Sequence, residues 1–189
     1  MDAKIRDKTN VVIILAIIAI IGCFYLFTIR AGHNWGDDFS HYLLHAKNLA
    51  EGKSYSDTAY IPNSLYSTMS PKATYPILPL ILAPVYKLFG LNLTALKMVE
   101  LAFFLGVLVI LFLTYRRLLP FAYLVVLILL VGLNPYFWDF KDSILSDIPF
   151  LFFVYSTLFA IQHYYDGQTR SSWSLSYAWC SVATGRMRS

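Results

Sequence analysis

Four long apolar stretches alternate with polar segments along the chain. Residues 9–29 form a run of 21 positions without Asp, Glu, Lys or Arg. At about 1.5 Å per residue, a helix of this length crosses a hydrocarbon core of roughly 30 Å. Residues 98–115 carry one charge, Glu100. Residues 118–135 and 148–165 carry none. The pattern predicts four transmembrane helices.

Basic residues predict how these spans are oriented. Several basic residues precede the first span, as they do in a secretory signal peptide. A signal peptide is therefore the alternative to a retained membrane anchor. However, the apolar run exceeds the usual length of roughly 7–15 residues, and no clear small-x-small cleavage site precedes Arg30. With residues 1–8 in the cytoplasm, the Arg116–Arg117 turn is cytoplasmic too, as the positive-inside rule favours. Residues 30–97 and 136–147 are then outer loops.

The first outer loop contains two shorter helical patterns. Apolar residues recur at helical spacing from Phe39 to Ala50 and stop at Gly52, which predicts an amphipathic helix over about 38–51. The second pattern has an apolar run of only 12 residues with three prolines, too short and too interrupted to span. We expect it to form a second juxtamembrane helix over about 76–89, in the outer membrane interface.

The composition favours a membrane protein over a soluble one. The chain is 58% hydrophobic and only 14% charged, whereas soluble proteins average roughly 45–50% apolar residues. Its net charge of +4 is too small and too dispersed for a nucleic-acid partner. Cys23 and Cys180 form neither a disulfide framework nor a metal motif. We expect an all-α, multi-pass integral membrane protein of the cell membrane.

Acidic residues mark both outer loops. Asp37 and Asp38 precede the first predicted juxtamembrane helix, and Asp147 precedes the fourth span, with Pro149 in its first turn. Helix capping is the favoured interpretation of each acid alone. However, one Asp suffices for a cap, and a second carboxylate can act as a general base. The topology places both loops on one face of the membrane, so we expect them to line one cavity.

Two further groups of residues have local interpretations. His41 and His45 lie four residues apart on one helix face, close to Asp38, so a divalent cation is one interpretation; ordinary amphipathic side chains are the favoured one. Glu100 lies just inside the second span, where a charge is costly and tends to face a cavity or a partner. Lys97, one turn earlier, is its expected ion-pair partner.

The order of these elements resembles the GT-C superfamily of membrane glycosyltransferases, and is similar to its protein mannosyltransferase and aminoarabinose-transferase branch. The resemblance covers about residues 9–165. In that family the first outer loop carries an acidic pair followed by two juxtamembrane helices, and an acid in the second outer loop precedes the fourth span. The segments that carry the likeness are Gly36-Asp37-Asp38, Tyr42 to Gly52, Tyr75 to Gly90, and Asn134-Pro135 through Pro149-Phe150.

The resemblance implies transfer of a sugar from a polyprenyl-phosphate donor to an acceptor hydroxyl on the outer side, with inversion at the anomeric carbon. Asp37 would deprotonate the acceptor, with Asp38 beside it, while Tyr42, Lys72 and Asp147 would bind substrate. A lysine can offset the departing phosphate, although a snorkelling interface lysine is the alternative for Lys72. Some members of the superfamily use a metal; no cofactor is certain here. The expected partners are the donor, membrane lipid and an unidentified acceptor.

Two other classes of function stay open. A transporter or channel subunit would use Glu100 and Asp147 as pathway residues, but the chain lacks the mid-span polar residues and helix breaks typical of such proteins. A non-catalytic membrane scaffold leaves the Asp37–Asp38 pair unexplained. Family members have about a dozen spans and this sequence has four, followed by a polar tail over 166–189. We therefore expect the N-terminal piece of a longer protein.

Overall fold

The structure is a computed structural model that describes residues 3–33, 38–58 and 75–183, with side chains from residue 7 to residue 165. Within these ranges it is all-helical and contains no strand. In chain order the helices are α1 (Ala3–Phe27), α2 (Phe39–Glu51), α3 (Ile77–Phe89), α4 (Leu93–Tyr115), α5 (Phe121–Gly132), α6 (Pro135–Phe140) and α7 (Asp147–Ala183).

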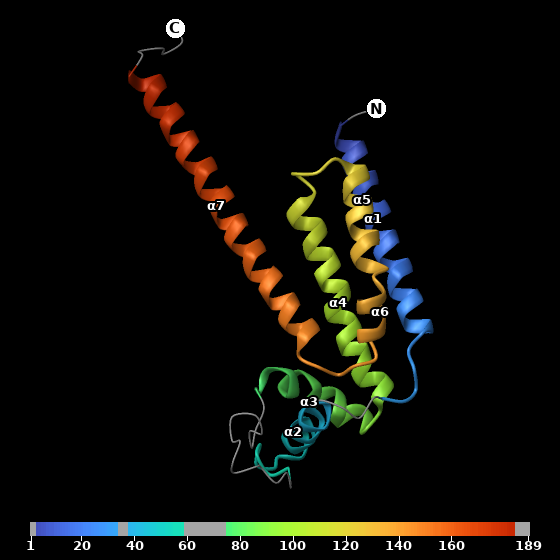
Figure 1. Cartoon of the computed structure of the whole chain (residues 1–189). Coiled ribbons are helices and arrows are strands. Elements are labelled where there is room, and N and C mark those ends of the chain that lie inside the picture. Colours follow the sequence, from blue (N-terminus) through green and yellow to red (C-terminus); the bar gives the residue numbers. More distant parts are fainter. Residues whose placement is uncertain (1–2, 34–37, 59–74, 184–189) are drawn as a thin grey trace.

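The long helices form an up-and-down bundle closed at one end by α2 and α3 (Figure 1). The start of α1 and the turn between α4 and α5 lie at one end of the bundle, which we call the Arg116 end. The α2–α3 pair, the α6–α7 loop and the start of α7 lie at the other, the α2–α3 end. Helix α7 begins against α4 and leans away from the bundle as it rises (Figure 1). Both loops that carry the predicted site are therefore at one end.

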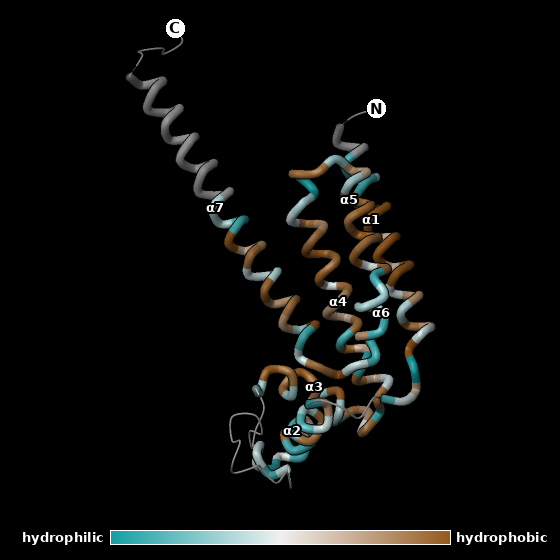
Figure 2. The backbone as a smooth tube through the Cα atoms, in the orientation of Figure 1, coloured by the Kyte–Doolittle hydropathy of each residue, from teal (hydrophilic) through white to brown (hydrophobic). Residues whose placement is uncertain are grey.

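Two of the described helices are long and apolar enough to cross a membrane: residues Asp7–Phe27 of α1, and α4. Figure 2 shows apolar residues along α1, α4, α5 and the first part of α7, with polar residues gathered around α2. Helix α5 has only 12 residues, about 18 Å of rise, and its direction continues into α6 after a break at Leu133–Asn134. The third and fourth spans stay predictions.

The bundle packs tightly where helices meet at glycine. A Cβ on Gly132 of α5 would lie 2.5 Å from Ile21 Cδ1 of α1, and one on Gly106 of α4 would lie 2.6 Å from the Phe152 ring of α7. Real carbon contacts are longer than this, so a larger residue would require the Ile21 or Phe152 side chain to move. These glycines allow α1–α5 and α4–α7 to approach closely.

Helices α2 and α3 lie within one residue of the segments predicted at about 38–51 and 76–89. Helix α2 ends at Gly52, whose φ of 69° is in the left-handed region that glycine adopts at low cost. The two helices share a small core that is separate from the bundle core and includes Leu96 of α4 and Ile144 of the α6–α7 loop. This second core attaches the α2–α3 pair to the end of the bundle. The juxtamembrane position of the pair stays a prediction.

Candidate functional site

Tyr42 links α2 to the loop before α7 at the α2–α3 end. It lies on the inner face of α2 and is buried, and its hydroxyl lies 3.0 Å from Ser146 Oγ, just before α7. Burial raises the pKa of Tyr42, the charges of Asp38, Asp147 and Glu100 raise it further, and the bond to Ser146 lowers it. Carboxylates from three parts of the chain therefore raise the pKa of one hydroxyl group through their charge.

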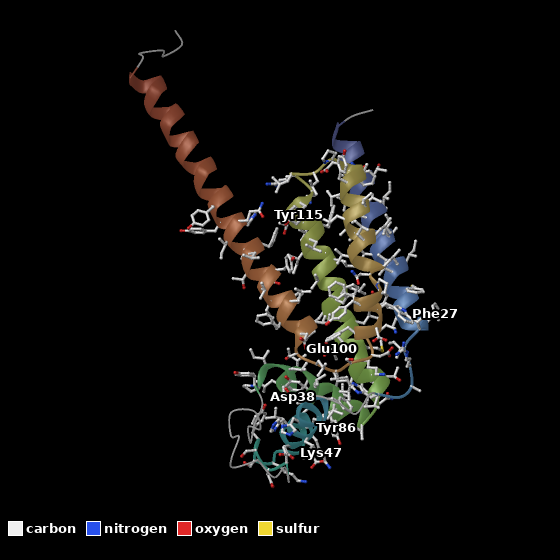
Figure 3. The ribbon with its side chains drawn as sticks, in the orientation of Figure 1. Phe27, Asp38, Lys47, Tyr86, Glu100 and Tyr115 are labelled. Carbon is white, nitrogen blue, oxygen red and sulfur yellow. The ribbon has the colours of Figure 1, made fainter. Side chains whose placement is uncertain are left out.

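Glu100 is the buried member of this group. Its side chain is 1% exposed, and neither carboxylate oxygen has a hydrogen-bond partner among the described residues. Figure 3 shows it in the lower part of α4, where the bundle meets α2 and α3, with Asp38 at the same end. Leaving a buried polar atom unpaired is costly. We call Asp38, Tyr42, Glu100, Ser146 and Asp147 the Tyr42 cluster.

The predicted caps are corrected by the structure. Asp38 occupies the N-cap position of α2, but its exposed side chain accepts no capping hydrogen bond. Asp147 is the first residue of α7 rather than its cap, because the Ser146 carbonyl accepts the first helical bond, from the Phe150 N–H at 2.8 Å. An acid in the first turn still interacts favourably with the helix dipole. Capping therefore does not account for Asp38.

Lys97 has a different partner from the one predicted. Its side chain is completely buried, and its Nζ donates to Asp142 Oδ1 at 3.2 Å, not to Glu100. The same nitrogen donates to the backbone carbonyls of Arg30 at 2.8 Å and Gly32 at 2.6 Å. The prediction of a Lys97–Glu100 pair was wrong, because these oxygens from distant loops surround the ammonium group.

Asp142 is the centre of a second, saturated cluster. Its Oδ2 accepts from Lys141 Nζ at 2.7 Å, and its Oδ1 accepts from the Arg30 N–H at 2.8 Å. Burial raises the pKa of Asp142, but the bonds from Lys141, the Arg30 amide and Lys97 outweigh this, and the pKa lies below its usual value. Arg30 also pairs with Asp139 at 3.1 Å. We call Arg30, Lys97, Asp139, Lys141 and Asp142 the Asp142 cluster.

Contacts beside the Asp142 cluster also join the segment after α1 to α6 and the α6–α7 loop. The Ile144 N–H donates to His33 Nε2 at 3.0 Å, and the His33 ring stacks on Phe39 at the start of α2. Trp138 donates to the Thr28 hydroxyl at 3.0 Å, and its ring lies under both Arg30 and Lys141. The segment that follows α1 is therefore held by α6 at Thr28 and by the α6–α7 loop at His33.

The two histidines of α2 are part of the α2 packing. Their rings meet edge to face at 6.0 Å, and His45 Nδ1 donates to the Tyr55 carbonyl at 2.6 Å while its ring stacks on Tyr55. Burial lowers the pKa of His45, the bond to Tyr55 raises it, and His41 lowers it, so the pKa lies below its usual value. Within the described part of the chain no three His, Cys, Asp or Glu residues are placed to hold a metal ion.

The remaining predicted site residues, Asp37 and Lys72, lie outside the described residues. Sequence reasoning missed the Asp142 cluster. Its one signal was a lysine, Lys97, at the start of an apolar span, where a buried cation needs a counter-charge. That signal points to a partner without saying which one.

Two apolar grooves lie along α3, and one of them includes a residue of the Tyr42 cluster. One, of about 460 Å³, is lined by the start of α3 and the start of α7 and includes Ser146. The other, of about 640 Å³, lies between α3, α4 and α7. Both fall in the range of roughly 300–1,000 Å³ typical of small-molecule sites. The first groove brings apolar walls to Ser146 of the Tyr42 cluster.

No protein-family model, curated protein or solved structure matches the chain.

Proposed function

We propose that this chain is a multi-pass membrane glycosyltransferase of the GT-C type. It transfers a sugar from a polyprenyl-phosphate donor to an acceptor hydroxyl, with inversion at the anomeric carbon. The reaction takes place at the outer face of the cell membrane.

The observation that carries this proposal is the Tyr42 cluster beside an apolar groove. Carboxylates and hydroxyls bind and deprotonate sugar hydroxyls, while an apolar groove suits an isoprenoid chain. The groove between α3 and α7 shares Ser146 with the cluster. An amphipathic donor could therefore place its lipid in the groove and its sugar at Tyr42.

The membrane arrangement in this proposal uses four spans. The apolar lengths of α1 and α4 support the first two, and α5 with α6 and the first part of α7 would provide the others. The basic Arg116–Arg117 turn favours the cytoplasm for its end of the bundle. The Tyr42 cluster would then face the outer side.

The proposed chemistry is a single displacement. Asp37 takes the proton of the acceptor hydroxyl, whose oxygen attacks the anomeric carbon from the face opposite the phosphate. The bond from that carbon to the phosphate oxygen breaks, and polyprenyl phosphate leaves. Tyr42 and Asp147 bind the sugar hydroxyls, and Lys72 offsets the charge of the departing phosphate.

Donor binding tests this proposal without knowledge of the acceptor. The purified chain in lipid nanodiscs is titrated with a fluorescent short-chain polyprenyl-phosphate sugar. We expect saturable binding that is weakened by Asp147→Asn and by Ile77→Trp, which fills the groove beside Ser146. The control Asp57→Asn changes an exposed acid of the first loop outside the Tyr42 cluster. Equal binding by all four proteins would contradict the proposal.

A further inference from the structure

A small basic pocket lies at the Arg116 end, far from the Tyr42 cluster. It has a volume of about 80 Å³ and lies between the last turn of α4 and the middle of α7. Figure 3 marks this end of α4 by Tyr115. The residues that line the pocket are Leu113, Thr114, Arg116, Arg117, Phe159, Gln162 and His163.

The pocket lining is arranged in two levels. Helices α4 and α7 both run toward the Arg116 end (Figure 1). On α4, the apolar Leu113 comes one turn before Arg116 and Arg117; on α7, Phe159 comes one turn before His163. Both helices therefore present an apolar residue deeper in the bundle and basic or polar residues nearer its end. This order matches the acyl-to-headgroup order of a phospholipid.

The two arginines are available to a ligand. Both are exposed, and neither forms an ion pair with any residue that the structure describes. No described Asp or Glu lines the pocket. The backbone N–H of Arg116 is already bonded to the Phe112 carbonyl at 2.9 Å, so the binding groups are side chains. Guanidinium groups bind phosphate oxygens in a fixed, often bidentate geometry.

The volume limits what the pocket can hold. About 80 Å³ is far below the roughly 300–1,000 Å³ of sites for drug-sized ligands. A whole sugar nucleotide would not fit. A single tetrahedral phosphate group is of suitable size, and the apolar level below it favours a phosphate attached to a lipid.

We propose that this pocket binds the phosphate of an anionic glycerophospholipid from the leaflet at the Arg116 end. Arg116 and Arg117 hold the phosphate, Gln162 and His163 supply further polar contacts, and Leu113 and Phe159 contact the upper acyl chains. This site is separate from the proposed donor site and does not depend on glycosyl transfer. It requires only that α4 and α7 lie in a bilayer.

Native mass spectrometry of the purified chain tests the site directly. The chain in detergent is titrated with phosphatidylglycerol, with phosphatidylcholine of the same acyl chains, and with inorganic phosphate. We expect selective binding of phosphatidylglycerol. A basic residue near an anionic lipid surface contributes about fivefold in affinity, so the double variant Arg116→Gln/Arg117→Gln should bind about 30-fold more weakly.

Matched variants separate the pocket from general charge effects. Lys53→Gln/Lys87→Gln removes two exposed lysines at the opposite end and should leave binding unchanged. Leu113→Trp fills the pocket without altering charge and should also abolish the selectivity, with helicity by circular dichroism as the folding check. Phosphatidylglycerol selectivity that survives in Leu113→Trp would overturn the proposal. The proposal would also be overturned if the Lys53/Lys87 control lost phosphatidylglycerol binding to the same extent as the arginine variant. Equal binding of phosphatidylcholine would overturn it, and so would competition by inorganic phosphate at the concentrations used for the lipid.

Discussion

Two polar clusters lie at the α2–α3 end, and they differ in how their charges are matched. In the Asp142 cluster, Lys97 contacts three oxygens and Asp142 accepts from three nitrogens. In the Tyr42 cluster, the charges of three carboxylates raise the pKa of the Tyr42 hydroxyl. The buried carboxylate, Glu100, has no hydrogen-bond partner among the described residues. Both clusters draw on the segment between α1 and α4 and on the segment between α5 and α7.

The difference suits a structural role for the Asp142 cluster and agrees with the functional role that we propose for the Tyr42 cluster. A buried charge whose partners are all present holds the chain in place, and losing one partner is costly. A buried carboxylate without a partner weakens the fold, so another benefit must offset its cost. Unpaired carboxyl groups at the ends of membrane helices commonly belong to sites. The predictions below test this division between the Asp142 cluster and the Tyr42 cluster.

Breaking the Asp142 cluster should give the largest effect. We expect Lys97→Met to lower the free energy of unfolding by about 3–5 kcal/mol, because it removes one of the two ammonium groups bonded to Asp142 and leaves the Arg30 and Gly32 carbonyls without their donor. The double variant Lys97→Met/Asp142→Leu should not recover this loss, because it leaves the buried Lys141 ammonium without its carboxylate partner. The measurement is reversible unfolding in mixed micelles, with the exposed Lys87→Met as the control. A loss below about 0.5 kcal/mol, the size of a surface effect, would show that the cluster is not structural.

Replacing the first-loop acids should affect transfer and not stability. In a protein with measurable sugar transfer, we expect Asp37→Asn to lower the rate by about 10²–10⁴, the usual contribution of a general base. Asp38→Asn should cause a smaller fall. Unfolding should be unchanged, because Asp38 makes no capping bond in α2. Near-normal turnover in Asp37→Asn would remove the catalytic role of that residue.

Glu100 should behave in the opposite way to Lys97. Glu100→Leu removes an unpaired buried carboxyl, and we expect the free energy of unfolding to rise by about 1–3 kcal/mol while donor binding becomes weaker. The same micelle unfolding and nanodisc titration measure both quantities. Leu101→Ala, a change in the neighbouring bundle core, should lower stability instead. If Glu100→Leu lowered the free energy of unfolding, Glu100 would have a structural role like that of the Asp142 cluster.

Below about pH 4, Asp142 should contribute to the pH dependence of stability. Because the pKa of Asp142 is held below its usual value of 3.8, the unfolded chain binds its proton first as the pH falls. The contribution of Asp142 is therefore fully present above about pH 4 and is lost as the pH drops through the lower folded pKa. Asp142→Asn should flatten the stability curve below pH 4. Asp139→Asn, an exposed acid, should leave its shape unchanged.

Much of the architecture could be predicted from local patterns. The helix bounds of α2 and α3 follow from apolar spacing and from Gly52 at the end of α2. Alternating helices place both loops at one end whatever their packing, so the presence of Asp38 and Asp147 at the α2–α3 end also follows from order along the chain. The short length of α5 could not be predicted in this way, because residues 118–135 carry no charge to mark the break at Leu133–Asn134.

By itself, the sequence determined which segments are helical and which residues share an end of the bundle, because hydrophobic period and chain direction are local properties. Only the tertiary structure decided the partners. Lys97 and Glu100 are three residues apart on α4, the spacing of a helical ion pair, yet Lys97 bonds to Asp142, 45 residues away. The choice depends on which oxygens reach the ammonium group when the loops fold over it. The same folding leaves Glu100 buried beside Tyr42 without a described hydrogen-bond partner.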